Sequence, residues 1–194
     1  MEVEVDCRNK SVDNLPPEWK ETPLSDISNR ITDGDHLTPH RTESGYYLLS
    51  ARNIADGHVD LSDVDYVGES EYRRMRSRCD PEAGDVLLSC SGTIGHVAIV
   101  PDEIECVLVR SAALIKPDRS ISNGLFLQYA LQSDAEQQQI IEGQNRGAQP
   151  NLFLNQIEQI HVPLPPRPEQ RAIAEVLSDV DALIERLDAL IAKK

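Results

Sequence analysis

Four arginines gather in one short stretch of the chain. The segment YRRMRSRC contains Arg73, Arg74, Arg76 and Arg78. A guanidinium group is a rigid, permanently charged fork of N–H donors, which suits a phosphate group or the edge of a guanine base. The same arginines could instead form a solvated surface cluster that pairs with Glu69 and Glu71. The sequence leaves both interpretations open.

Three further stretches combine turn-forming residues with side chains that donate and accept hydrogen bonds. They are TDGDHLTPH at residues 32–40, SCSGTIGH at residues 89–96 and NRGAQPNL at residues 145–152. Sequence-specific contact with nucleic acid needs fixed donor and acceptor geometry at the base edges, so loops rich in His, Thr, Asn, Gln and Arg fit that chemistry. Glycines within these loops would let backbone amides approach a phosphate closely.

Each of these loops also has a plainer explanation. The Ser-Gly-Thr step at residues 91–93 could be only a tight turn, and Asn151 could simply cap the segment that follows it. His36 and His40, together with Asp33 and Asp35, could bind a metal ion. No further cluster of ligands is visible in the sequence, so a metal site is not expected.

The net charge argues against nucleic acid as a partner. The chain has 194 residues and a formal net charge of −14 at pH 7. Non-specific affinity for DNA comes mainly from Lys and Arg that neutralise phosphates, and an acidic chain repels DNA at long range. The acids are unevenly distributed, however, with nine acids against four bases in residues 1–35. A local basic patch around the arginine cluster can therefore survive.

Other features of the composition predict the compartment. No apolar run approaches the length of a membrane span, and the N-terminal segment MEVEVDCRNK is acidic where a signal peptide would be basic and then apolar. We therefore expect a soluble, cytoplasmic protein without a membrane partner. Four cysteines without a CxxC pair predict reduced thiols rather than a zinc ribbon or a disulfide framework.

Apolar runs predict a β core that would hold the polar loops. Strands are predicted over residues 45–54, 86–88, 97–100 and 106–115, and the second and third form a hairpin or two crossing strands. Spaced apolar residues predict a helix or helix pair over residues 123–143, and ESEYRRMRS predicts a short helix that carries the arginines. A final strand is predicted within LNQIEQIHVPLPP, residues 154–166.

The chain then passes through a proline collar into a long helix. The collar PLPPRP, residues 163–168, predicts a stiff, extended spacer. Beyond it, apolar residues recur at alternating spacings of three and four, as in a heptad seam, at Ile173, Val176, Val180, Leu183, Leu187 and Leu190. So wide a stripe needs a partner, which is either another helix or the helix's own domain. The collar favours another helix, because a stiff spacer would hold this one off the body.

Taken together, these segments resemble the specificity subunits of type I restriction-modification systems. The resemblance rests on PLPPRPEQRAIAEVLSDVDALIERLDALIAKK and continues upstream through GDVLLSCSGTIGHVAIVP, ITDGDHLTPHRTESGYYLLSARNI and the GAQPNL loop. It implies an α/β fold: a target recognition domain with a twisted β core, residues 1–164, followed by a long projecting C-terminal α-helix, residues 165–194. That helix would act as spacer and docking arm.

The resemblance also implies a function and a set of site residues. The chain would read one half of a bipartite site in double-stranded DNA and dock methyltransferase subunits and, in some systems, restriction subunits. By match to the loops of that family, and from the arginine cluster, the residues expected to contact DNA are His36, Thr38, His40, Arg52, Asn53, Arg73, Arg74, Arg76, Ser91, Thr93, His96, Arg146, Gln149 and Asn151.

The chain departs from that family in its number of repeats. A standard specificity subunit resembles two such units in tandem, whereas this chain resembles one. We therefore expect a half-length form in which the stripe from Ile173 to Leu190 pairs two copies into a twofold homodimer. Identical domains would read identical half-sites, so the expected target is an interrupted palindrome.

No motif for catalysis is present in the sequence. It contains no glycine-rich loop of the methyl-donor or dinucleotide type, no P-loop and no Asp/Asn-Pro-Pro-aromatic motif, so neither catalysis nor a cofactor is expected. Two other functions stay open. An acidic DNA mimic would explain the charge but not the arginine cluster, and a coiled-coil scaffold that does not bind DNA would explain the helix but not the polar loops.

Overall fold

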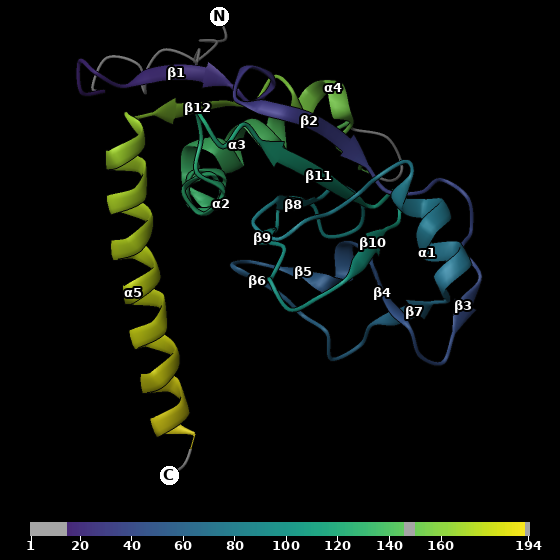
Figure 1. Ribbon diagram of the computed structural model, residues 1–194. Coiled ribbons are helices and arrows are strands. Elements are labelled where there is room, and N and C mark those ends of the chain that lie inside the picture. The colour runs from purple at the N-terminus through teal and green to yellow at the C-terminus, as the bar shows by residue number, and fades with distance from the viewer. Residues whose placement is uncertain (1–14, 146–149, 193–194) are drawn as a thin grey trace, which may run out of the picture.

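The fold is organised around a four-stranded antiparallel sheet (Figure 1). The computed structural model describes residues 15–145 and 150–192. The strands lie in the order β2 (Ser28–Asp33), β11 (Ala112–Pro117), β8 (Val86–Ser89) and β9 (Val97–Ile99). The predicted hairpin is confirmed as β8 and β9, in which Leu87 lies opposite Ala98.

Both faces of this sheet are buried, which explains the continuous apolar run in β8. Val86 and Leu88 belong to one core cluster and Leu87 to another, because successive side chains of a strand point to opposite faces. The first cluster includes apolar residues of helices α2 (Gly124–Gln132) and α3 (Asp134–Gly143). These helices confirm the helix pair predicted over residues 123–143.

A second four-stranded sheet covers the other face. Its order is β10 (Cys106–Leu108), β4 (Tyr46–Leu49), β7 (Asp65–Val67) and β3 (Arg41–Thr42). Helix α1 (Glu69–Arg76) packs on this sheet through Tyr72 and Met75, and the Tyr72 ring stacks on Tyr46 with ring centroids 3.8 Å apart. The predicted short helix that carries the arginines is therefore confirmed.

The prediction of a single strand over residues 106–115 was wrong. β10 and β11 belong to different sheets, and the chain crosses between them at residues 109–111. Other segments hold the backbone of this crossover: Arg110 N–H donates to the carbonyl of Asp35 at 3.0 Å, and the carbonyl of Ser111 accepts from Cys90 N–H at 2.8 Å. The sequence is apolar on both sides of the crossover, so hydrophobicity alone did not reveal the change of sheet.

Two small sheets complete the β structure. β1 (Lys20–Pro23) pairs with β12 (His161–Leu164), and β5 (Ile54–Ala55) pairs with β6 (His58–Val59). The final strand is shorter than predicted, because residues 154–157 form the helix α4 (Leu154–Ile157). The Gln156 side chain reaches back to accept the Phe153 N–H at 2.8 Å, a capping contact that favours a helical turn over a strand.

The C-terminal helix α5 (Arg167–Ile191) is anchored at its start by a buried glutamine. Oε1 of Gln170 accepts the Asn123 N–H at 2.8 Å, and Nε2 donates to the carbonyls of Ile121 at 3.0 Å and Pro165 at 2.8 Å. Because these bonds join the helix both to the loop before α2 and to the proline collar, they set the direction in which α5 leaves the β structure.

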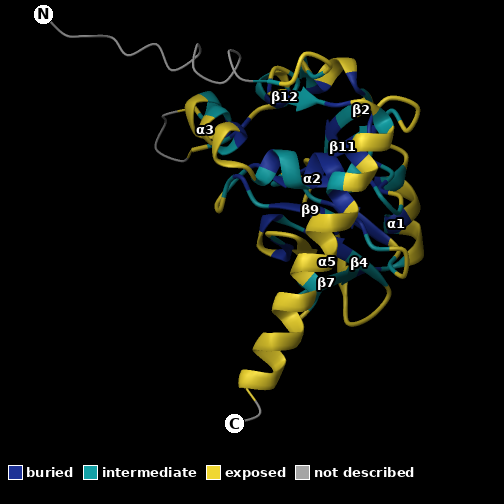
Figure 2. Cartoon of the chain, turned by 90° about the vertical axis from the view of Figure 1, so that its left-hand side faces the viewer, coloured by how far each residue is buried: buried dark blue, intermediate teal, exposed yellow. Residues whose placement is uncertain are grey.

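We expected the proline collar to hold the whole of α5 away from the rest of the domain. This expectation was wrong for the first half of the helix. Ala174 is buried and Ile173 half-buried where α5 lies against α2, and farther along the Tyr129 hydroxyl donates to Asp181 Oδ2 at 2.6 Å. The later turns leave the body and are exposed (Figure 2). Within residues 15–145 and 150–192, neither α5 nor any other helix is long and apolar enough to cross a membrane.

Three cysteines, Cys79, Cys90 and Cys106, lie in the described part of the chain as buried free thiols. Burial raises the pKa of each thiol to about 12. Because the thiolate is the reactive form, these side chains act as small apolar core residues, which agrees with the prediction of reduced thiols. Cys7 lies outside the described residues.

Candidate functional site

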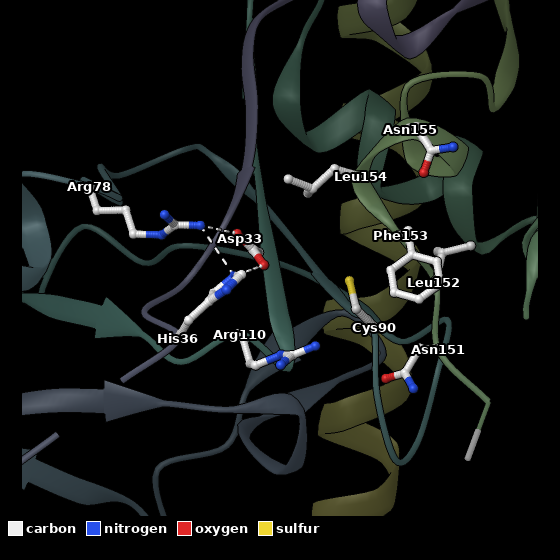
Figure 3. Close-up of a pocket in the computed structure, with 10 residues that line it drawn as sticks. All are labelled: Asp33, His36, Arg78, Cys90, Arg110, Asn151, Leu152, Phe153, Leu154 and Asn155. Carbon is white, nitrogen blue, oxygen red and sulfur yellow. Dashed lines mark hydrogen bonds and ion pairs between the residues drawn. The ribbon is translucent and has the colours of Figure 1, made fainter. Parts of the chain in front are cut away.

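All three polar loops contribute residues to one cleft, the third through its end at residues 151–152 (Figure 3). Its volume is about 350 Å³, and it is lined by Asp33, His36, Arg78, Cys90, Arg110 and residues 151–155. Ser91 and Asn151 form a β-bridge, and Leu152 N–H donates to the carbonyl of Cys90 at 3.0 Å. Segments more than 100 residues apart in sequence therefore form one continuous surface.

One wall of the cleft is a charged triad. Nε2 of His36 lies 2.6 Å from Oδ2 of Asp33, and Nη2 of Arg78 donates to Oδ1 of the same carboxylate at 2.9 Å. Nη2 of Arg78 also lies 3.2 Å from Nε2 of His36, so the three side chains form one connected cluster.

A buried carboxylate joins this loop to helix α1. The side chain of Asp35 is 7% exposed, forms an ion pair with Arg74 and accepts the Leu37 N–H at 3.1 Å. Burial by itself would raise the pKa of Asp35, but the hydrogen bonds from Leu37 N–H and Arg74 outweigh it and lower the pKa. Asp35 is therefore ionised at neutral pH and ties residues 32–40 to the arginine cluster.

The arginine cluster is paired within the chain. Arg73 pairs with Glu69, and Arg74 lies 2.8 Å from Glu71, as the plainer interpretation predicted. The guanidinium of Arg76 donates to the Tyr72 hydroxyl at 2.7 Å and lies 5.5 Å from the centroid of that ring. Hydrogen bonds to Glu71 and Asp35 raise the pKa of Arg74. Contact of Arg73, Arg74 and Arg76 with DNA stays a prediction, and it would compete with these internal partners.

Two predicted residues in the 50–53 segment lie apart from the cleft. Asn53 is 1% exposed, and its amide accepts the Ser50 N–H at 3.0 Å and donates to the carbonyls of Asp60 and Asp63, each at 3.1 Å. The expectation that Asn53 contacts DNA is therefore corrected, because it holds a turn inside the core. Arg52 is exposed but pairs with Asp63 at 3.3 Å and Asp65 at 3.0 Å.

The remaining predicted residues either do not line the cleft or lie outside the described residues. Thr38, His40 and Thr93 have exposed side chains. His96 is turned toward the β5–β6 hairpin, where its Nδ1 lies 3.3 Å from Oδ2 of Asp56. Arg146 and Gln149 fall outside the described residues. Among residues 15–145 and 150–192, no group of three or more His, Cys, Asp or Glu side chains could hold a metal ion.

Of the ten residues that line the cleft, the predicted set contained His36 and Asn151. Arg78 was noted within the arginine cluster but not assigned to a site, and Arg110 and Asn155 were not considered. A signal for Arg110 was present, since Arg-Ser is the one polar step inside the run VLVRSAALI. No local pattern distinguishes Asn155, whose place in the cleft depends on the turn at α4.

Comparison with known proteins identifies the family of this chain. Residues 16–193 match the family model described as the type I restriction modification DNA specificity domain. The chain belongs to this family. It is 26% identical over 194 aligned residues to the type I restriction enzyme EcoBI specificity subunit of Escherichia coli, with 92% of this chain and 39% of that subunit covered. The predicted resemblance is therefore confirmed.

Solved structures confirm the α/β fold with its twisted sheets and C-terminal helix. A chain of a type I R-M system superposes with a TM-score of 0.69 at 19% identity, covering 95% of this chain and 43% of that one. The HsdS subunit from Thermoanaerobacter tengcongensis superposes with a TM-score of 0.62 at 20% identity, covering 91% and 41%. The chain thus spans about two fifths of the length of these family members.

Proposed function

We propose that this chain reads one half of a bipartite site in double-stranded DNA and docks the methyltransferase subunits of a type I restriction-modification complex. Restriction subunits would join it in systems that contain them, and all catalysis would lie in these partners. The proposal rests on membership of the DNA specificity family. The convergence of polar loops on one cleft supports it, because base readout needs several donors and acceptors on one rigid surface.

The ion pairs of the site would preorganise the loop at residues 32–40. Arg78 holds Asp33, and Arg74 holds Asp35, so the backbone between these aspartates is fixed before DNA arrives. His36 and Thr38 would then meet the base edges or the phosphates without first being ordered. With a net charge of −14, the chain alone supplies little counterion release, and we expect it to bind DNA weakly without its partner subunits.

The exposed half of α5 would form the docking arm. Apolar side chains on one side of this helix are exposed to solvent, namely Val176, Val180, Leu183, Leu187 and Leu190. Leu177 and Ile184 lie on the neighbouring side and line a groove between α5 and the body. We propose that the first set pairs with a second copy of the chain about a twofold axis. An antiparallel pairing would place two recognition domains at opposite ends of the helices.

A mobility shift on duplex DNA, with the methyltransferase subunit present, tests this function. We expect a shift that falls steeply with salt, together with methylation of a defined bipartite site in the complex. Assembly with the methyltransferase without any shift would indicate a coiled-coil scaffold. Competition with DNA for the methyltransferase cleft would indicate an acidic mimic. Nanomolar, sequence-specific binding by the chain alone at physiological salt would contradict the expected dependence on partners.

Replacement of a cleft residue tests the site within the same complex. His36→Ala is expected to reduce the free energy of discrimination between the target site and single-base variants by roughly 1 to 3 kcal/mol per lost base contact. Folding should be largely unchanged, because the His36 side chain is 49% exposed. Methylation of the target and of single-base variants measures the effect. His58→Ala, an exposed histidine on β6, is the matched control. Full site choice in the His36 variant would remove this residue from the interface.

A further inference from the structure

Arg110 differs from the other arginines within residues 15–145. Seven of them lie within 4.0 Å of a carboxylate, namely Arg30, Arg41, Arg52, Arg73, Arg74, Arg78 and Arg119. Arg76 instead donates to the Tyr72 hydroxyl. The guanidinium of Arg110 is exposed and makes no ion pair or hydrogen bond to any part of the chain that the structure describes. In so acidic a protein, its guanidinium is thus available to an outside partner.

The backbone that carries this side chain is held firmly. Arg110 N–H donates to the carbonyl of Asp35 at 3.0 Å, and the preceding Val109 N–H donates to the carbonyl of Leu49 at 3.0 Å. The next residue, Ser111, accepts the Cys90 N–H through its carbonyl and the Ala51 N–H through its hydroxyl. Bonds to three other segments, at Asp35, at residues 49–51 and at Cys90, therefore fix the Cα position of Arg110, which is how precise recognition geometry is built.

The side chain projects into the middle of the cleft. Figure 3 shows Arg110 between His36 on one side and Asn151 on the other. The second wall is formed by the amides of Asn151 and Asn155 and by the apolar side chains of residues 152–154. Arg78, the other cation of the cleft, is already engaged by Asp33. The surroundings of Arg110 are thus mostly neutral groups that hydrogen-bond or pack.

We propose that Arg110 is a specificity-determining residue, which donates two hydrogen bonds to O6 and N7 of a guanine in the target half-site. This inference rests on the function proposed above. A phosphate-binding site usually combines several cations or backbone N–H groups. Side-chain amides and apolar side chains, like those around Arg110, are instead the groups that contact base edges. Arg110 also breaks no internal ion pair when it binds, in contrast to the paired arginines of α1.

Selection from a randomised duplex pool tests the assignment, with the full chain bound to its methyltransferase subunit. The wild-type complex should enrich a half-site that contains guanine at one position or more. Arg110→Ala should lose the preference for one such guanine by about 5- to 150-fold, while the preferences at other positions persist. Replacing that guanine with 7-deazaguanine, which lacks the N7 acceptor, should weaken the wild-type complex but not the Arg110→Ala complex.

Two further variants separate base readout from charge. Arg119→Ala removes another exposed arginine, which lies outside the cleft, and should retain every preference. Arg110→Lys keeps the charge but not the planar fork, so it should keep the salt dependence while the guanine preference falls.

Unchanged base preferences in Arg110→Ala would overturn the inference. The inference would also be overturned if Arg110→Ala weakened binding to all DNA sequences equally and Arg110→Lys restored that binding, because this result indicates a phosphate contact. If the wild-type complex enriched no sequence, the proposed function itself would fail, and this inference with it.

Discussion

Leu183→Asp is expected to convert a twofold dimer of this chain into a monomer. Leu183 lies in the middle of the apolar stripe of α5 and is 55% exposed in the single chain. In a seam formed by two copies, the substitution would bury a carboxylate without a partner at two symmetric positions, at a cost of about 3 kcal/mol or more at each. Because Leu183 contributes little to the core of its own domain, the monomer should remain folded. Sedimentation at tens of micromolar measures the change.

Ala189→Asp is the matched control for this experiment. Ala189 is exposed on the same helix but lies two residues beyond Leu187, about 200° farther round the helix axis. The same charge placed there should leave the dimer intact. A wild-type chain that sediments as a monomer would contradict the pairing, as would a Leu183→Asp variant that stays dimeric. In either case the stripe of α5 would be assigned to a different partner, such as the methyltransferase subunit.

Gly34→Ala is expected to destabilise the fold by at least about 3 kcal/mol. A Cβ atom at residue 34 would lie 2.2 Å from both the carbonyl carbon and the carbonyl oxygen of Leu108, which are backbone atoms of β10. Neither can move without displacing the crossover that carries Arg110, since Gly34 N–H also donates to the carbonyl of Ala112 at 3.2 Å. Urea unfolding measures the loss of stability, and the DNA selection described above measures the loss of site choice.

Gly68→Ala separates the steric effect from a general cost of replacing glycine. A Cβ atom at residue 68 would meet its nearest neighbour, a Thr42 methyl group, at 3.8 Å, an ordinary van der Waals distance. Neither Gly34 nor Gly68 has a positive φ, so both backbones accept alanine. Only the Gly34 variant should be strongly destabilised. Equal stability of the two variants would show that the loop at residues 32–40 does not press on the crossover.

Local patterns were sufficient for the parts of the fold that depend on near neighbours. The hairpin of β8 and β9 follows from two apolar runs around a glycine-rich turn, and α5 follows from its heptad spacing and the prolines before it. The arginines of α1 and their glutamates lie three or four residues apart, a spacing that brings them together on any helix. The family resemblance also depended only on the order of such segments.

Long-range contacts decided which residues reach the site. Asn53 and His36 were both expected to contact DNA, yet the Asn53 side chain donates to the carbonyls of Asp60 and Asp63, whereas His36 lines the cleft. Arg110 looked like a strand residue, because the run around it is apolar in both directions.

The sequence by itself therefore determined most of the helices and strands, the family and the exposed stripe of α5, since these depend on spacing along the chain. Only the tertiary structure decided that β10 and β11 belong to different sheets, which places Arg110 in a cleft. It also decided which arginines outside α1 are paired and that the first half of α5 lies on α2. The physical reason is that sheet membership, ion pairing and burial depend on residues that are distant in sequence, whereas hydrophobic periodicity records only the local face of a helix or strand.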